Sequence, residues 1–169
     1  MAVVSAARIR SKQIGDALAT LIKANAGSLS LKVAQFGAIE LIADPSLVSA
    51  LIPGVFIKSE TTTITPGAAS FRMYDVTDTF RICYGFDASS NVLELPDKLS
   101  DDVNTIVRAL AQDVKLSAVA DFGTDQIVES RPLDVLWINE EDVFFLENKI
   151  PVRVVVLRWD VKWMARDTT

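Results

Sequence analysis

Apolar side chains recur at helical spacing in two stretches of the chain. In the first stretch, residues 4–26, one stripe is formed by Ala7, Ile14, Leu18, Leu21 and Ile22. In the second stretch, the stripe is formed by Leu99, Val103, Ile106, Val107, Leu110 and Val114. Ser100, Asp101 and Asp102 place a hydroxyl group and negative charge where the second helix is expected to begin, which suits its positive amino end. Because an apolar period of three to four residues is typical of a helix with one buried face, we predict two main helices.

Alternation of apolar and polar residues predicts the strands. The clearest strand has its apolar positions on one parity, namely Tyr74, Val76, Phe80, Ile82, Tyr84 and Phe86. An extended segment is expected to begin at Val55–Ile57, and two further strands are predicted at 126–138 and 150–163. Between these two lie an acidic turn, NEED, and a VFFL segment whose state the pattern leaves open.

The last predicted strand changes its apolar face partway along. Val154 and Val156 share one parity, whereas Leu157, Trp159 and Trp163 share the other. A strand whose middle is buried on both sides, or a bulge, would account for this change. The two tryptophans are expected either to pack in the chain's own core or to anchor a contact between subunits.

The order of elements predicts an α+β fold, with a mostly antiparallel β-sheet packed against two main helices in a single domain, residues 1–169. Residues 31–42 are ambiguous between strand and helix, and Asp44 followed by Pro45 predicts the start of a short helix that ends near Ile52. The threonine-rich segment 59–70 is expected to be a strand end that runs into a mobile loop or hairpin tip.

Composition narrows the classes of function. The chain has 169 residues, half of them apolar, which is enough for one sizeable core. Its net charge of −5 gives no support to binding along a nucleic-acid backbone, and its single cysteine, Cys83, excludes an intrachain disulfide. No signal sequence is expected, and no apolar run approaches the roughly 20 residues that a membrane helix needs. We therefore expect assembly in a reducing cytoplasm.

The residues that usually carry catalysis are few. The chain contains no histidine, which excludes histidine-based triads and histidine-bearing metal sites. Cys83 is interpreted as a packed side chain, Asp101–Asp102 as a helix start and Glu140–Asp142 as a solvated turn. The scattered glycines form no phosphate-binding loop. We expect a protein that is not an enzyme, with no catalytic residue, cofactor or metal.

Four segments carry a resemblance to a known family. They are IPGVFIKSE, DVTDTFRICYGF, LSDDVNTIVRALAQDV and IPVRVVVLRWDVKW, preceded by an amphipathic helix. In this order they resemble the tail-terminator proteins of long-tailed bacteriophages. The resemblance implies a subunit of a ring, expected to be hexameric, that caps the tail tube, stops its polymerisation and joins it to the head-side connector.

The resemblance also implies partners and a place in the virion. The partners are further copies of the chain, the tail tube protein and the head-side stopper or connector protein, with the tail sheath as a further candidate. DNA would only pass through the ring, and no membrane is involved. The protein would lie in the neck, at the top of the tail, after assembly in the cytoplasm of the host bacterium.

The candidate contact residues lie in the threonine-rich segment, the acidic turn and the last strand: Glu60, Thr61, Thr62, Thr63, Glu140, Glu141, Arg153, Trp159 and Trp163. Two alternatives remain open. The first is a head-completion or stopper protein of the same neck. The second is a small-molecule-binding module whose open sheet face is lined by Tyr74, Tyr84 and Trp137.

Overall fold

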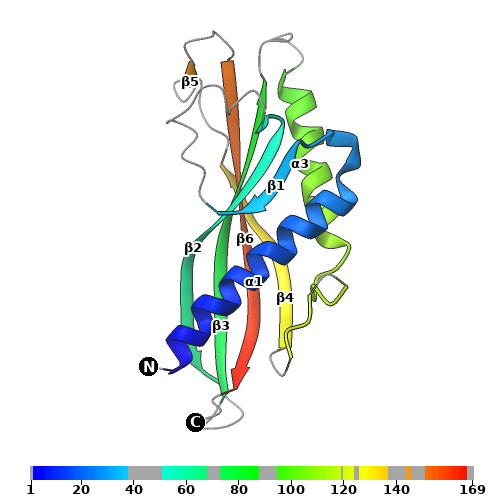
Figure 1. Cartoon of the computed structure of the whole chain (residues 1–169). Coiled ribbons are helices and arrows are strands. Elements are labelled where there is room, and N and C mark those ends of the chain that lie inside the picture. Colours follow the sequence, from blue (N-terminus) through cyan, green and yellow to red (C-terminus); the bar gives the residue numbers. More distant parts are fainter. Residues whose placement is uncertain are drawn as a thin grey trace.

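The computed structural model of the chain describes residues 2–37, 51–67, 73–87, 95–118, 120–123, 126–136, 144–145 and 151–166. Its helices are α1 (Ala2–Asn25), the short 3-10 helix η1 (Gly27–Leu29) and α3 (Leu95–Ala111). Its strands are β1 (Val33–Phe36), β2 (Gly54–Pro66), β3 (Met73–Asp87), β4 (Gln126–Leu136), β5 (Phe144–Phe145) and β6 (Pro151–Arg166). The predicted α+β class is confirmed (Figure 1).

The strands form one sheet in the order β1-β2-β3-β6-β4, and the short β5 also pairs with β6. The sheet is mixed, because β1 runs parallel to β2 while the other pairs are antiparallel. This corrects the prediction of a mostly antiparallel sheet. The sequence of residues 31–42 did not distinguish strand from helix, so the parallel strand could not be placed from the pattern.

The core lies between one face of the sheet and the two helices. α1 crosses that face diagonally and contacts β1, β2 and β3, and α3 packs beside it (Figure 1). The predicted apolar stripe of α1 is buried at all five of its positions, and Val103, Ile106 and Leu110 of α3 are buried as well. Periodic apolar positions thus fix which side of each helix faces the sheet.

β6 is an interior strand of the sheet and lies between β3 and β4. Its odd-numbered residues from Val155 to Ala165 are buried in the core, whereas the even-numbered residues from Val154 to Met164 are only partly buried. β6 pairs with β3 from end to end without a shift in register. The predicted change of face or bulge in this strand is therefore wrong. The odd-numbered residues face the core along the strand, and the partly buried Val154 and Val156 lie on its outer face.

One predicted boundary is tested only in part, and another needs correction. Residues 59–66 belong to β2, which pairs with β3 as far as Pro66 opposite Tyr74, with one register shift between Ser59 and Thr61. Residues 68–70 lie outside the described residues, so the loop or hairpin tip stays a prediction. α3 begins at Leu95, so Ser100, Asp101 and Asp102 lie in its second turn and do not form its amino end. The predicted helix after Asp44 lies largely outside the described residues.

One close approach joins α1 to β1. A Cβ atom added to Gly15 would lie 2.0 Å from Cδ2 of Phe36, so only glycine lets the Phe36 ring rest on the helix at this point. The same ring contacts Phe80 of β3 edge-on, with 6.3 Å between the ring centroids. Phe36 thereby connects α1 to the middle of the sheet.

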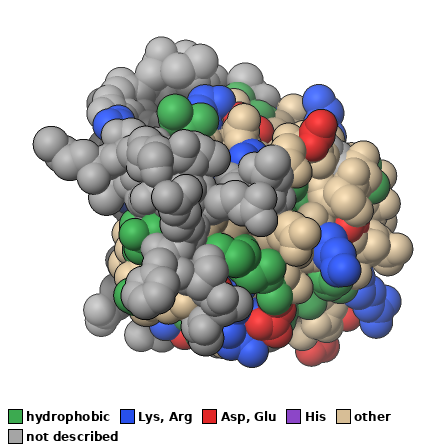
Figure 2. Space-filling view, turned by 90° about the horizontal axis from the view of Figure 1, so that it is seen from below, with side chains coloured by type: hydrophobic (Ala, Val, Ile, Leu, Met, Phe, Trp, Pro, Cys, Tyr) green, Lys and Arg blue, Asp and Glu red, His purple; other side chains and the backbone are tan. Residues whose placement is uncertain are grey.

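The first turns of α1 and the last residues of β6 lie at the same end of the molecule (Figure 1). Seen from this end, hydrophobic side chains are exposed among charged side chains of both signs (Figure 2). A mixture of apolar and charged groups is ordinary for a protein surface and does not by itself mark a contact site.

Candidate interaction surface

The two edges of the sheet differ in which of their residues pair with a neighbouring strand. β1 pairs only with the first four residues of β2, Gly54–Ile57. Among the described strands, none pairs with the outer edge of β2 from residue 58 to residue 66. The opposite edge is formed by β4, whose other side has no partner among the described strands. Unpaired strand edges present backbone donors and acceptors and are natural contact sites.

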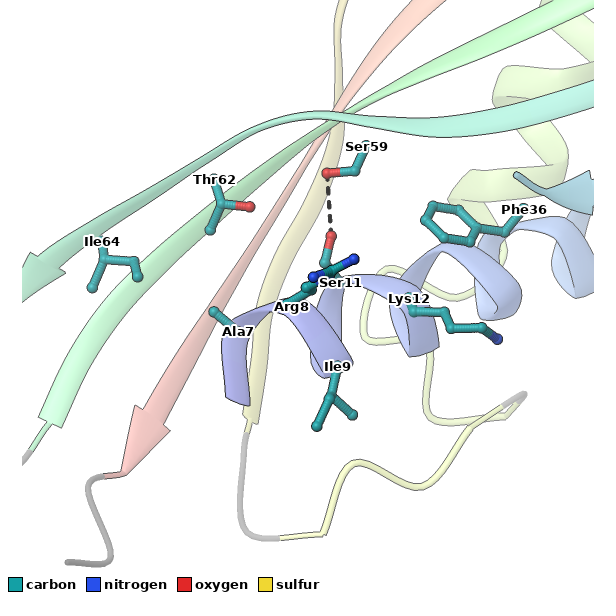
Figure 3. A pocket seen from close by; sticks show the side chains of 9 residues that line it. All are labelled: Ala7, Arg8, Ile9, Ser11, Lys12, Phe36, Ser59, Thr62 and Ile64. Atoms are coloured by element: carbon teal, nitrogen blue, oxygen red, sulfur yellow. Dashed lines mark hydrogen bonds between the residues drawn. The ribbon is translucent and has the colours of Figure 1, made fainter. Parts of the chain in front are cut away.

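A groove lies between α1 and the open half of β2, with a volume of about 870 Å³. It is lined by Ala7, Arg8, Ile9, Ser11, Lys12, Phe36, Ser59, Thr62 and Ile64. Figure 3 shows Ser11 of α1 directed at Ser59 of β2, and their hydroxyl oxygens are 3.3 Å apart. This bond ties the helix to the strand at one point and leaves the groove open beside it.

The rim of this groove is apolar and basic. Ile9 points away from β2 (Figure 3), and 64% of its surface is exposed. Arg8 is exposed beside it and forms no ion pair with any described residue. The Lys12 ammonium lies 2.7 Å from the Asp16 carboxylate one turn further along the helix. The groove therefore offers aliphatic surface and one positive charge to a partner.

The β4 edge carries three exposed aliphatic side chains, Val128, Leu133 and Leu136, and the first two lie at bulges. The pairing of β4 with β6 shifts register between Ile127 and Glu129 and again between Pro132 and Asp134. Val128 and Leu133, the residues at these two bulges, have 52% and 47% of their surfaces exposed. Bulges and an edge proline interrupt the regular backbone ladder, which protects this edge from simple strand addition.

The outer face of the sheet carries a row of ion pairs. Arg81 donates two hydrogen bonds to Oε1 of Glu60, at 2.9 and 2.6 Å. Arg158 donates two hydrogen bonds to Asp134, from Nε to Oδ1 and from Nη2 to Oδ2. This guanidinium lowers the pKa of the Asp134 carboxyl. Thr79 donates a hydrogen bond to Asp160 at 2.7 Å. Charges on this face are thus mostly satisfied within the chain.

The core face contains a buried carboxylate, that of Asp78, which is fully buried. Asp78 accepts hydrogen bonds from the Thr62 hydroxyl and from Nε1 of Trp163 at 2.9 Å. Burial raises the pKa of the Asp78 carboxyl, and the two hydrogen bonds lower it in part. Sequence reasoning missed this residue, although Asp78 has the same parity as Val76 and Phe80 and is therefore expected on their face.

The structure corrects the role predicted for the tryptophans. Trp159 and Trp163 are each 1% exposed, and Nε1 of Trp159 donates a hydrogen bond to Ser130 at 2.6 Å. Their indole rings belong to the hydrophobic core, so they are not surface anchors. The alternative prediction, core packing, is the one the structure confirms.

The other predicted contact residues have different outcomes. Thr61, Thr62 and Thr63 are exposed on the open half of β2, and only Thr62 lines the groove. Glu60 is partly buried in its ion pair with Arg81. Glu140 and Glu141 lie outside the described residues, and for Arg153 the structure describes the backbone in β6 alone.

Two of the three residues predicted to line a small-molecule site on an open sheet face lie on the core face instead, where Tyr74 is partly buried. Tyr84 is buried on the core side, where its hydroxyl donates a hydrogen bond to Asp102 of α3 at 2.8 Å. Burial and this carboxylate raise the pKa of the Tyr84 phenol. Trp137 lies outside the described residues. Tyr84 therefore links the sheet to α3 and does not line an outer pocket.

Among the residues that the structure describes, no three His, Cys, Asp or Glu side chains gather where they could hold a metal ion. Burial raises the pKa of the Cys83 thiol, although Arg81 and Lys58 lower it in part, so the reactive thiolate is disfavoured. None of the helices in the described ranges is long and apolar enough to cross a membrane.

No protein-family model matches the chain, and no curated protein matches it. The resemblance to tail terminators therefore depends on the order of the four segments and on their patterns of apolar and polar residues. The function that follows from it is a proposal.

Proposed function

We propose that the chain is a single-domain subunit of a ring in a bacteriophage neck, and that this ring caps the tail tube. In this role the protein works by contact with copies of itself, with the tube protein below and with the head-side connector above. A ring of six subunits is expected from the resemblance to tail terminators.

The observation that supports this proposal best is the difference between the two edges of the sheet. The β2 edge has a groove beside it, and the β4 edge has protruding aliphatic side chains at two bulges. Two unlike surfaces on opposite sides of a subunit favour head-to-tail association, and head-to-tail contacts close into rings when the rotation between subunits allows it. A two-fold dimer would instead need one surface that fits itself.

The proposal is tested by adding the purified protein to polymerising tail-tube protein and imaging the products by electron microscopy. We expect rings at tube ends and tubes that stop growing. The control is the same tube preparation without the protein. Tubes that grow to unchanged lengths without an added ring would contradict the terminator role, and binding to the head-side complex alone would support the stopper alternative.

A further inference from the structure

We propose that the contact between neighbouring subunits places the β4 edge of one copy in the α1–β2 groove of the next. In this contact Val128 and Leu133 enter the groove, and Glu129 faces Arg8. The inference rests on the proposed ring, and it names the surfaces that close that ring.

The first support is where exposed apolar side chains are found. The described large hydrophobic residues with high exposure are Ile9, Val114, Val128, Leu133 and Leu136. Ile9 belongs to the groove, and three of the other four belong to β4. Exposed aliphatic groups therefore concentrate on two surfaces, which lie on opposite sides of the sheet. Burying both against each other would remove this apolar area from water.

The second support is that the two surfaces lie at the same level along the strands. Across the sheet, Ile64 of β2 pairs with Val76 of β3, Val76 pairs with Trp163 of β6, and Trp163 pairs with Ile127 of β4. Ile127 immediately precedes Val128, so Ile64 and Val128 lie at nearly the same level along the strands.

The other end of the groove is level with the second bulge. Ser59 of β2 pairs with Phe80 of β3, Phe80 pairs with Trp159 of β6, and Trp159 pairs with Pro132 of β4, which immediately precedes Leu133. The two bulges thus lie opposite the two ends of the β2 wall of the groove. A closed ring permits no net rise from one subunit to the next, so complementary surfaces must share one level along its axis. This condition is met when the strands run along that axis.

The third support is charge. Glu129 follows Val128 on the β4 edge, where, among the described residues, it forms exposed ion pairs with Arg131 at 3.4 Å and with Lys162 at 3.5 Å. Exposed ion pairs are weak, so this carboxylate can also meet a positive charge on a partner. Arg8 precedes Ile9 at the groove and has no described ion-pair partner. An aliphatic residue beside a carboxylate on one surface therefore matches an aliphatic residue beside a guanidinium on the other. Such pairs set register and orientation more than affinity.

The contact is made by side chains. Pro132 has no amide hydrogen to donate, and the two bulges break the spacing of backbone groups on β4. A continuous β-sheet across subunits is therefore disfavoured. The bulges instead turn Val128 and Leu133 outward as two separate aliphatic projections.

The test uses chemical cross-linking of the full chain with Cys83→Ser as background. A double variant, Ile9→Cys with Val128→Cys, is treated with a short bifunctional maleimide, and the products are separated under denaturing conditions. Because the two positions lie on opposite sides of one subunit, head-to-tail contact predicts a ladder of linked chains that ends at the number of subunits in the ring. The single variants Ile9→Cys and Val128→Cys are the controls, and each should give no ladder.

The outcomes separate the alternatives. A ladder in the double variant alone supports the inference. Strong linked dimers in either single variant would show a two-fold contact and overturn it, as would the absence of links in all three variants.

A charge exchange tests the pairing of Glu129 with Arg8. We expect Arg8→Glu or Glu129→Arg alone to weaken self-association about fivefold, because one attraction becomes a repulsion, and we expect the double variant to regain affinity to within about twofold of the parent. Lys98→Glu, at an exposed position of α3 away from both surfaces, is the matched control and should change nothing. Failure of the double variant to regain affinity would overturn the pairing.

The same preparations are then added to tail-tube protein, which separates the inference from the proposed function. A head-to-tail ladder without effect on tube length would support the inference and reject the terminator role. Capped tubes without a ladder would support the terminator role and reject the inference.

Discussion

Among the described residues, Asp78 is the only carboxylate that is buried. A buried carboxylate loses its hydration, and the two donors, Thr62 and Trp163, replace only part of it. The raised pKa of Asp78 means that the folded protein binds its proton more tightly than the unfolded chain does. Stability from this group is therefore complete below the ordinary pKa of 3.8 and declines as the pH rises toward the raised value.

We predict that Asp78→Asn removes this decline. An asparagine in the same position can accept a hydrogen bond from Trp163 through its oxygen and donate one to the Thr62 hydroxyl through its amide. The variant should match the parent below pH 3.8 and exceed it in stability at pH 7, as measured by urea unfolding over a pH series. Asp78→Ala should lose about 1–3 kcal/mol, because it leaves the indole N–H unpaired. Equal pH dependence in the parent and the Asn variant would contradict the prediction.

Cys83 gives a second prediction at this scale. Burial raises the pKa of its thiol, so a smaller fraction is thiolate at pH 8 than in the unfolded chain. Alkylation by iodoacetamide should therefore be slower for the folded protein than for the same protein in concentrated urea. A folded protein that reacts as fast as the unfolded control, or faster, would show an activated thiol and reopen the question of catalysis.

At the scale of elements, α1 depends on Gly15 as well as on its apolar stripe. Glycine costs about 1 kcal/mol of helix propensity relative to alanine, yet here it makes room for the ring of Phe36. We predict that Gly15→Ala destabilises the protein by about 1–3 kcal/mol, because the methyl group displaces that ring. Chemical denaturation measures the effect.

A double-mutant cycle provides the control for this prediction. In a Phe36→Ala background the clash is gone, so the same Gly15→Ala change should become stabilising by roughly the propensity term. Loss of stability of the same size in both backgrounds would mean that the ring does not set the requirement for glycine.

Elements with a clear period were predictable from the sequence. The stripe of α1, the alternation of β3 and the position of β6 all follow from apolar spacing, because a buried face needs apolar side chains at that spacing. The short parallel strand β1 was not predictable, since four residues do not establish a period. The bulges of β4 were also missed, because a bulge depends on how two strands pair and leaves no mark in the pattern of one.

The candidate surface was predicted only in part. Thr62 of the threonine-rich segment lines the groove, but most of the other lining residues come from α1, far away in the sequence. That this segment makes a contact stays a prediction. Trp159 and Trp163 were ambiguous because aromatic residues serve both cores and interfaces. Arg8, Ile9, Val128 and Leu133 carried no distinctive signal, since single exposed apolar or charged residues are normal in any chain.

At the scale of the whole molecule, the proposed ring assembly should couple the free energy of unfolding to protein concentration. Because association favours only the folded state, a tenfold rise in concentration should raise the melting temperature by about 3 °C. Ile9→Asp should abolish this dependence, because a carboxylate at the groove rim opposes docking. Scanning calorimetry at several concentrations gives the measurement.

Val114→Asp is the matched control for that experiment. Val114 has 46% of its surface exposed but lies on neither proposed contact surface. The concentration dependence should survive in this variant. If the melting temperature lost its concentration dependence equally in both variants, the association would be non-specific and hydrophobic instead of a defined ring contact.

The start of α1 and the end of β6 share one end of the molecule (Figure 1). In a cyclic assembly whose strands follow the axis, peptide tags fused to either terminus would all decorate the same rim. Antibody or gold labelling of such fusions would thus reveal which rim meets the tube, and a bulky fusion would obstruct stacking on that side while sparing the other.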